Sequence, residues 1–371
     1  MAKLVRTDEE TMLADSARGF LDENAPVSHL RRMRDAGQIF DRTLWKQMAE
    51  MGWTGILVPE ECGGSAMGHS AACVLAGEMG RTLVQSPFIS TAVIGATVYA
   101  SVMDTRSRDA LAAIASGDMI VALAMDENAK FDPERIDTKA EKVGNGYRIS
   151  GTKRLVLGGV SADRLMVLAQ TENGPTLFEI SPDSQGVARD GLQMIDSTDA
   201  ADIRLDAVEV DGDAVLGALG GAMDVLEPAL RAGQAALAAE MTGLAGGAMA
   251  MTVAYLKDRK QFGVPIGAFQ ALQHRAAHLW CECEVTASAV LNAGRLLDED
   301  PDNAQMAVSL AKARATDTAQ LAVREGVQMH GGIGMTDAFD MGFFMKRARV
   351  AAEWLGDYGY HANIVAQARG F

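Results

Sequence analysis

The spacing of apolar residues divides this chain into three segments. Residues 1–118 mostly follow the helical period, as in DEETMLADSARGFLDENA at 8–25, where an apolar stripe follows an acidic start. Residues 119–218 change to a period of two, in short runs bounded by Gly, Pro, Asp and Asn, and the helical period returns over 219–371. This order predicts an α+β multi-domain protein with an N-terminal helical domain (1–118), a central antiparallel β-barrel or sandwich (119–218) and a C-terminal four-helix bundle (219–371).

The last segment carries two apolar faces and one glycine-rich interruption. The first predicted helix face contains Phe269, Leu272, Ala276, Leu279 and Cys283, and the second contains Met306, Leu310, Ala313 and Leu321. The interruption is QMHGGIG at 328–334. Each glycine costs a helix about 1 kcal/mol relative to alanine. Three glycines together therefore indicate a close approach of the backbone to a ligand.

Charge and composition limit the kind of partner. The net charge of −15 argues against binding to nucleic acid or to anionic membranes. No run approaches the roughly 18 consecutive apolar residues of a membrane span. The N-terminus has no apolar signal segment. We therefore expect a cytoplasmic protein without a membrane span, in which the four cysteines remain reduced thiols.

A metal site is not expected. His274 and His278 are four residues apart on a predicted helix, which is a possible ligand pair. No cysteine or carboxylate that could complete the set is evident beside them. A solvated helix surface is the better interpretation of this pair.

Several motifs resemble the acyl-CoA dehydrogenase family. YLKDRKQFGVPIGAFQALQH (255–274) and VQMHGGIGMTDAFDMGFFMKRAR (327–349) are similar to its flavin-binding signatures. GWTGILVPEECGG (52–64) and GNGYRISGTKRLVLGGVSADRLMVLA (144–169) resemble the same family in the same order. The resemblance implies an FAD cofactor that takes a hydride from an acyl-CoA thioester, a glutamate that removes the α-proton, and an electron-transferring flavoprotein as acceptor.

The resemblance also implies a set of cofactor-binding residues. In this family's oligomers one subunit supplies an arginine and a glycine-rich turn to the ADP portion of its neighbour's FAD. An arginine suits the pyrophosphate because its guanidinium binds phosphate oxygens bidentately. The alternative for His330 is an ordinary loop histidine, and no acid–base role is expected of it. The matching positions here are Arg259, Phe262, Gln270, Gln328, Met329, His330, Gly331 and Gly332.

Departures from the family pattern concern the flavin ring and the base. Where relatives have a Thr-Glu-Pro loop and then Gly-Ser-Asp, this chain has MDENAKFD (125–132), with Phe131 in place of the serine. Where relatives have Trp-Ile-Thr-Asn, it has LVLG (155–158). Leu155 and Leu157 provide neither an aromatic ring nor a hydrogen-bond donor to a flavin.

The usual catalytic glutamate falls on Leu355, which cannot accept a proton. Some relatives place the base on the first bundle helix, at a position that matches Gly233 here. Glu240 lies seven residues further, two turns along the same face, and is the nearest candidate base. The alternative is that Glu240 has a structural role only.

Residues that relatives direct at a neighbour's cofactor are thus retained, whereas those facing the chain's own flavin ring are mostly apolar. This sorting favours one subunit of a heteromeric acyl-CoA dehydrogenase, a heterotetramer in which a second, dehydrogenase-like chain carries the base. Three alternatives stay open: a self-sufficient homotetramer that uses Glu240, a flavin monooxygenase on the same fold, and a non-catalytic assembly protein. The acyl group of the substrate is not readable from the sequence.

Overall fold

The computed structural model describes residues 5–371, which form two compact units. The helical unit contains the chain up to Arg32 together with 69–84 and 234–371, and the sheet unit contains 33–68 and 85–233. Helices of the N-terminal segment are distributed over both units. In this way α1 (Asp8–Asn24) and α4 (Gly68–Thr82) belong to the helical unit, whereas α3 (Arg42–Glu50) belongs to the sheet unit.

A single mixed sheet forms the centre of the sheet unit, in the order β6-β7-β3-β2-β4-β5-β8 with β1 paired to β4. The prediction of a purely antiparallel sheet is wrong at β4, which runs parallel to both β1 and β2. A period of two reports which face a side chain occupies and not the direction of the neighbouring strand, so the pattern could not reveal this. The strands are β1 (Val121–Ala124), β2 (Lys139–Val143), β3 (Gly146–Leu157), β4 (Arg164–Thr171), β5 (Gly174–Ile180), β6 (Val187–Gly191), β7 (Ala200–Val210) and β8 (Val215–Leu216).

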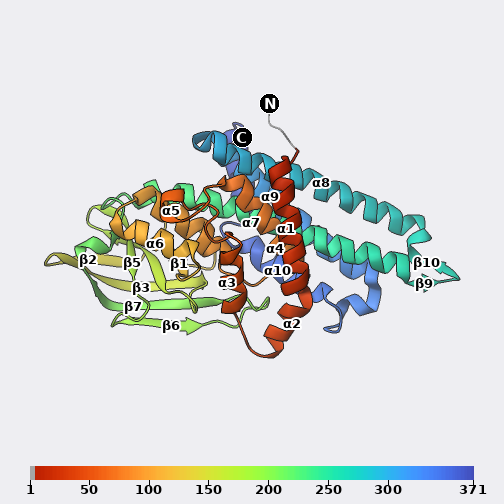
Figure 1. Ribbon diagram of the computed structural model, residues 1–371, viewed down its shortest axis with the longest axis horizontal. Coiled ribbons are helices and arrows are strands. Elements are labelled where there is room, and N and C mark those ends of the chain that lie inside the picture. The colour runs from red at the N-terminus through yellow and green to blue at the C-terminus, as the bar shows by residue number, and fades with distance from the viewer. Residues whose placement is uncertain (1–4) are drawn as a thin grey trace. The chain divides into compact units, whose positions relative to one another are not determined.

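One face of this sheet is covered by helices of the same unit, namely η2 (Phe88–Gly95), α5 (Ala96–Val102) and α6 (Thr105–Ala115) (Figure 1). The first of these is a π-helix over its whole length, and all eight of its residues are buried. The sheet itself contributes a core of aliphatic residues, with the Tyr147 and Phe178 rings in edge contact at 5.2 Å. Burial of these apolar side chains is the main stabilising contribution in this unit.

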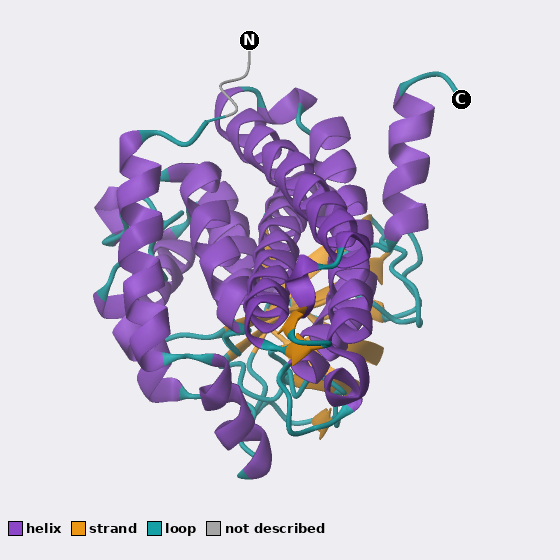
Figure 2. Cartoon of the chain, turned by 90° about the vertical axis from the view of Figure 1, so that its right-hand side faces the viewer, coloured by secondary structure: helices purple, strands orange, loops and turns teal. Residues whose placement is uncertain are grey.

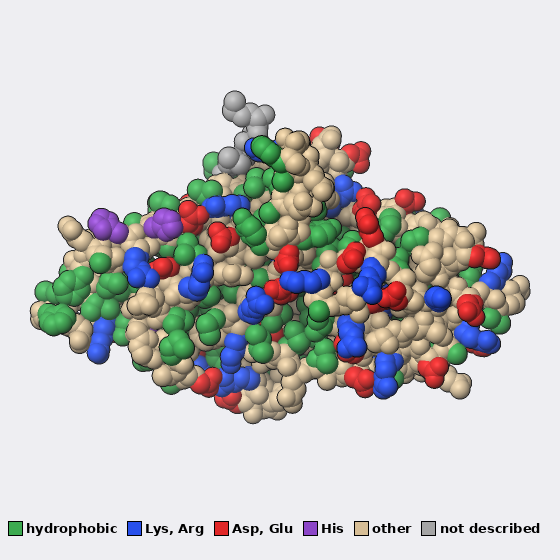
Figure 3. All heavy atoms as spheres, turned by 180° about the vertical axis from the view of Figure 1, so that it is seen from behind, with side chains coloured by type: hydrophobic (Ala, Val, Ile, Leu, Met, Phe, Trp, Pro, Cys, Tyr) green, Lys and Arg blue, Asp and Glu red, His purple; other side chains and the backbone are tan. Residues whose placement is uncertain are grey.

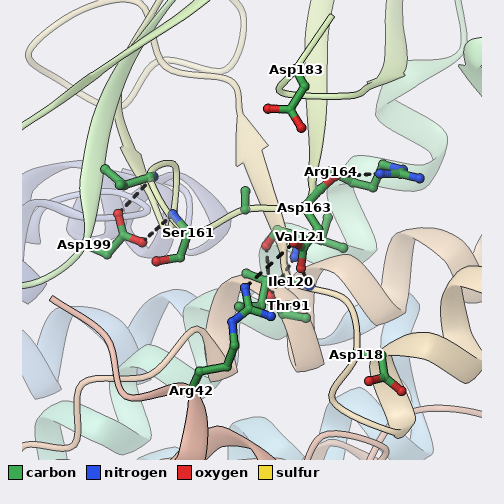
Figure 4. A network of polar contacts seen from close by, with 12 residues as sticks. Arg42, Thr91, Asp118, Ile120, Val121, Ser161, Asp163, Arg164, Asp183 and Asp199 are labelled. Atoms are coloured by element: carbon green, nitrogen blue, oxygen red, sulfur yellow. Dashed lines mark hydrogen bonds and ion pairs between the residues drawn. The ribbon is translucent and has the colours of Figure 1, made fainter.

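A polar network fixes the turn between β3 and β4 (Figure 4). The carboxylate of Asp199 accepts hydrogen bonds from the backbone N–H groups of Val160 and Ser161, at 3.0 and 2.9 Å. Asp163 in turn accepts from the N–H of Ile120 at 2.9 Å, and Arg42 lies 3.8 Å from its other oxygen. Carboxylates of this kind replace the ladder hydrogen bonds that a turn lacks. The turn that follows the LVLG segment is therefore rigidly placed within this unit.

The helical unit is a bundle of long helices (Figure 2). A short hairpin of β9 (Lys260–Gln261) and β10 (Val264–Pro265) joins two of them, and the turn η6 (Gly331–Met335) follows a third. Besides α1 and α4 its helices are α2 (Val27–Asp35), α7 (Ala222–Asp258, whose first residues lie in the sheet unit), α8 (Gln270–Glu299), α9 (Gln305–His330), α10 (Met341–Glu353) and α11 (Tyr358–Ala368).

Glycines let α4 and α7 cross with their backbones in contact. A Cβ added to Gly80 would lie 2.0 Å from the carbonyl oxygen of Glu240, and one added to Gly243 would lie 1.8 Å from that of Gly77. No side chain fits at such distances, so glycine is required at both positions. The crossing holds the middle of α7, and with it Glu240, against α4.

The longest helix departs from the expectation that no segment could span a membrane. Among the described residues α7 is the one helix long and apolar enough to do so by length and composition. Of its most apolar window, 56% is buried inside the protein. A helix at the centre of a bundle is apolar all round because protein surrounds it, which explains the composition without a bilayer.

Candidate functional site

The hairpin between α7 and α8 presents three of the predicted cofactor-binding residues to solvent. Arg259 is the exposed residue at the end of α7, and Gln270 is the exposed first residue of α8. Phe262, at the hairpin turn, is 92% exposed and has a φ of 52°. An aromatic residue in the left-handed region is strained, and leaving so large an apolar side chain in water is unfavourable. This hairpin is therefore shaped to contact something outside the chain.

The end of α9 exposes three more of the predicted cofactor-binding residues to solvent. The exposed Gln328 precedes Gly331, which ends the helix with a φ of 64° and donates its N–H to the carbonyl oxygens of Gln328 and Val327. Nothing lies within 4 Å of a Cβ placed on Gly331 or Gly332. The backbone is therefore open to a ligand on this side. Met329 and His330, also predicted to bind the cofactor, are instead buried in the bundle, so neither side chain faces the ligand side.

Two contacts bring these elements together at one end of the helical unit. The ring centroids of Tyr255 on α7 and His330 on α9 are 4.5 Å apart. Tyr255 lies one turn before Arg259, and His330 directly precedes Gly331. Arg275 on α8 forms an ion pair of 2.5 Å with Glu325 on α9. The two motifs, separated by about seventy residues in the sequence, thus form one surface.

This surface fits the nucleotide end of a dinucleotide. It combines an exposed guanidinium at Arg259, an exposed amide at Gln328 and bare backbone at Gly331 and Gly332. A guanidinium neutralises and hydrogen-bonds phosphate oxygens, and glycines allow the ligand to lie against the main chain. Apolar side chains also gather at the tip formed by this hairpin (Figure 3), among them the exposed Phe262, Val264 and Phe269.

The sheet unit has leucines at the positions where relatives have residues that face the flavin ring. Leu155 is 42% exposed with a φ of 51°, at a register shift of β3 against β7, and Leu157 is buried. The N–H of Leu155 already donates to Asp202 at 3.0 Å. Neither leucine side chain can donate a hydrogen bond, so the fit to a flavin ring is poor on this side.

Near MDENAKFD the sheet unit contains a buried ion pair that sequence reasoning missed. Lys153 is fully buried, and its Nζ donates to Glu127 at 2.5 Å and to the carbonyl oxygen of Met125 at 3.1 Å. Glu127 also accepts from the backbone N–H groups of Asp137 and Thr138. The sequence does show a lysine, Lys153, within a strand of period two. A lysine that is buried in such a strand requires a charged or hydrogen-bonding partner, so its position could have indicated this ion pair.

Asp126, in the same segment, has a buried Oδ1 atom without a hydrogen-bond partner. Burial raises the pKa of this carboxyl to about 6, with a further contribution from Asp132, while Lys153 opposes the shift. The side chain of Asp126 therefore offers a buried carboxylic acid in this segment.

Glu240 is engaged in an ion pair. Its Oε1 accepts from Nε of Arg347 on α10 at 2.6 Å, and both side chains are nearly buried. A charge-assisted hydrogen bond from a guanidinium holds this carboxylate in place within the bundle. The geometry therefore favours the structural role over the catalytic one.

Leu355, at the usual base position, is buried and has a φ of 56°. Its carbonyl oxygen accepts from Gln234 Nε2 at 3.2 Å and from His361 Nε2 at 2.9 Å. Lys312, fully buried on α9, donates to the carbonyl oxygens of Ala351 and Gly356 at 3.2 and 3.0 Å. These side chains satisfy the main-chain groups between α10 and α11, and they hold Leu355 in a backbone conformation unfavourable for a leucine.

Burial shifts the titration of both basic groups in this cluster. It lowers the pKa of Lys312 to about 7, against opposing contributions from Asp357 and Glu353. It lowers the pKa of His361 to about 4, with the nearby charge of Lys312 adding to the effect. Sequence reasoning missed both, although a lysine within the apolar face of α9 was a visible signal.

We expect His361→Gln to alter the acid dependence of stability. A histidine whose pKa is about 4 when folded and 6.5 when unfolded binds fewer protons in the folded state between those values. Wild-type stability therefore falls as the pH drops from 6.5 to 4, by about 3 kcal/mol from this group. Urea titrations of both proteins across this range should show their difference shrinking on acidification; a constant difference would contradict the assignment. Other titrating groups cancel in the comparison.

No group of three or more His, Cys, Asp or Glu residues suited to a metal ion occurs within residues 5–371. His274 and His278 are exposed on α8, and His278 lies 3.7 Å from Glu282. The arrangement is that of a solvated helix surface.

Comparison with known proteins assigns both helical segments to the same family. Residues 7–118 match the profile described as acyl-CoA dehydrogenase, N-terminal domain, and residues 221–369 match acyl-CoA dehydrogenase, C-terminal domain. Acyl-CoA dehydrogenase FadE12 of Mycobacterium tuberculosis is 29% identical over 83% of this chain and 82% of its own length.

Solved structures agree in fold. A chain of a variant of the Tcur3481-Tcur3483 steroid ACAD is 29% identical, with a TM-score of 0.89 over 98% of both chains. A chain of the ChsE4-ChsE5 complex from Mycobacterium tuberculosis is 24% identical, with a TM-score of 0.91 over 99% of both chains. The whole polypeptide, including the sheet unit that neither profile covers in full, therefore has the fold of these chains.

Proposed function

Because this chain belongs to the acyl-CoA dehydrogenase family of FAD-dependent oxidoreductases, we propose that it is one subunit of a heteromeric acyl-CoA dehydrogenase. In this assembly its helical unit binds the ADP portion of an FAD. A second chain binds the flavin ring of that FAD and supplies the catalytic base. We propose a cytoplasmic location, consistent with four free cysteines.

The observation that carries the proposal is the contrast between the two sets of positions. Arg259, Phe262, Gln270, Gln328, Gly331 and Gly332 are all exposed in the helical unit. At the base position, by contrast, Leu355 is a buried aliphatic residue, and the substitute Glu240 is paired with Arg347. The chain offers a formed surface for a nucleotide, and neither of its two candidate base positions presents a carboxylate that is free to remove a proton.

FAD, when bound, accepts the hydride that leaves the acyl chain. The residues of this chain bind the nucleotide portion of the cofactor and orient it. Arg259 neutralises the pyrophosphate, the Gln328 amide hydrogen-bonds the nucleotide, and Gly331 and Gly332 leave room for it against the backbone. Leu355 excludes water from its position but cannot hold a proton there.

Surface residues of the bundle support association with another chain. Met306 and Leu310, which the sequence places on an apolar face of α9, are each 39% exposed, and Trp280 and Val285 on α8 are more than half exposed. Exposed apolar residues in such number are typical of a protein interface. The 29% identical steroid ACAD carries two chain names, Tcur3481 and Tcur3483, as a heteromer would.

Expression of the chain alone and with a candidate partner that carries the family's glutamate tests the proposal. Alone, the protein should be colourless and should not reduce a dye with acyl-CoA; the co-expressed assembly should be yellow and active. A yellow, dye-reducing chain on its own would establish the self-sufficient enzyme instead. Oxygen consumption with reduced flavin and no acyl-CoA turnover would establish the monooxygenase.

Glu240→Gln separates a structural role from a catalytic one. In the active assembly we expect turnover within about twofold of wild type, because in this proposal the second chain and not Glu240 supplies the base. We expect the free energy of unfolding to fall by about 3 kcal/mol, because Arg347 loses its charged partner in a nearly buried position. Steady-state kinetics and urea titration measure the two effects. A loss of turnover of about a thousandfold without a loss of stability would make Glu240 the base.

A further inference from the structure

The imidazole of His330 is the centre of a ring cluster inside the helical unit. It is 3% exposed and packs against two aromatic rings, with its centroid 4.5 Å from that of Tyr255 and 4.6 Å from that of Phe339. The rings of Tyr255 and Phe339 also pack edge to face, with their centroids 6.2 Å apart. Tyr255 comes from α7, His330 ends α9, and Phe339 belongs to the loop before α10. Three separate parts of the chain therefore meet on one side chain.

The tautomer of His330 follows from its hydrogen bond. Nδ1 lies 2.7 Å from the carbonyl oxygen of Gly326, which can only accept, so Nδ1 carries the hydrogen. Nε2 is then a buried lone pair, and it has no hydrogen-bond partner among the described residues. The ring is held in one orientation by one hydrogen bond and by tilted contacts with the two aromatic rings.

Two neighbours of His330, Tyr255 and Gly331, connect it to the nucleotide-binding surface. Tyr255 is one turn before Arg259 and accepts the N–H of Arg259 on its own carbonyl oxygen at 2.9 Å. The carbonyl oxygen of Arg259 accepts the N–H of Ile266 at 2.8 Å, which closes the hairpin. On the other side His330 is bonded directly to Gly331. A movement of this ring therefore displaces the hairpin and the glycine turn together.

The third ring is anchored independently. Arg31 on α2 donates to the carbonyl oxygen of Asp337 and to the carboxylate of Asp340, both at 2.6 Å, on either side of Phe339. Gly334 lies close to His330, since a Cβ added to Gly334 would lie only 3.0 Å from the Cβ of His330. The loop 331–340 is thus held against the ring at both of its ends.

We propose that His330 is a positioning residue that makes the Gly331–Gly332 turn and the Arg259 hairpin one rigid body, pre-formed for the nucleotide. This inference rests on the proposed function, which says what the surface binds. It rests equally on the ring cluster, which connects the two elements physically. His330 touches no ligand; it acts through the two elements that do. A pre-formed surface binds more tightly because less freedom is lost on binding.

Hydrogen exchange followed by mass spectrometry on the full chain tests the coupling. In His330→Ala we expect exchange to accelerate about tenfold or more in 255–262 and in 331–339 together, because both segments lose the same contact. His330→Phe keeps a ring between Tyr255 and Phe339 and should restore both segments to within about threefold of wild type. Val323→Ala, at a buried position of α9 away from the cluster, is the matched control for general loss of packing and should not accelerate the two segments selectively.

The outcomes separate this inference from the proposed function. Faster exchange in 331–339 with 255–262 unchanged, or equal effects of Val323→Ala and His330→Ala, would overturn the coupling. The FAD content of the assembly with the partner chain is the second readout, and we expect His330→Ala to lower it and His330→Phe to retain it. A wild-type assembly without FAD would defeat the proposed function while leaving the coupling to be judged by exchange alone.

Discussion

Arg259→Ala is expected to remove most of the FAD from the assembly that this chain forms with its partner. Arg259 is the exposed guanidinium at the hairpin of the helical unit, and a charge-assisted, bidentate contact with a pyrophosphate is among the stronger polar interactions in proteins. Its loss should weaken FAD binding by about 2–4 kcal/mol, or about 30-fold to a thousandfold. Flavin absorbance relative to protein, measured after gel filtration, reports the change.

Arg204→Ala serves as the matched control. Arg204 is an equally exposed arginine on β7 of the sheet unit, where it pairs with Asp190 at 3.1 Å, and it belongs to no part of the nucleotide-binding surface. It should leave the flavin content unchanged. If Arg259→Ala also leaves it unchanged, the nucleotide is bound elsewhere, and the non-catalytic assembly protein becomes the better interpretation.

Lys312→Met is expected to abolish an alkaline rise in stability. Lys312 has a pKa of about 7 in the folded chain and 10.5 in the unfolded chain, so the unfolded state binds more protons between these values. The free energy of unfolding of the wild type therefore rises with pH over this range, by about 5 kcal/mol from this group. Below pH 7 both states are protonated and the contribution of the group becomes constant.

The same variant leaves the carbonyl oxygens of Ala351 and Gly356 without their buried donor. Each unsatisfied group costs about 1–3 kcal/mol, so the variant should be clearly less stable than wild type near pH 10. Near pH 7 the difference should be much smaller, because there the wild type also bears the cost of burying an amine that titrates. Urea titrations at several pH values measure this, with Lys257→Met at an exposed position of α7 as the control. Parallel curves for Lys312→Met and wild type would show that Lys312 does not titrate as its burial implies.

The order of helical and sheet elements could be predicted from the sequence, whereas cofactor binding by the eight predicted residues stays a prediction. Helical and period-two patterns report local geometry, and six of the eight predicted cofactor positions are exposed. The sequence did not show that Met329 and His330 are buried, because a motif does not show which face of a helix end turns toward the bundle. The burial of His330 depends on Tyr255 and Phe339, which lie far from it or beyond a loop.

Contacts between distant residues explain the other differences. The cluster around Leu355 joins Gln234, Lys312 and His361, whose convergence no local period can express. The parallel pairing of β4 with β1 and β2 depends likewise on the path of the chain outside the strands. Glu240 could be placed on a helix face from spacing alone, but its partner Arg347 is more than a hundred residues away.

The stoichiometry of flavin to polypeptide is the most direct measurement of what this subunit does. Native mass spectrometry of the purified assembly, combined with the flavin absorbance, counts chains and cofactors together. We expect FAD only when the partner is present, with one FAD for each pair of unlike chains. A homo-oligomer of this chain that holds one FAD per polypeptide and oxidises an acyl-CoA would contradict the division of the site between two different subunits.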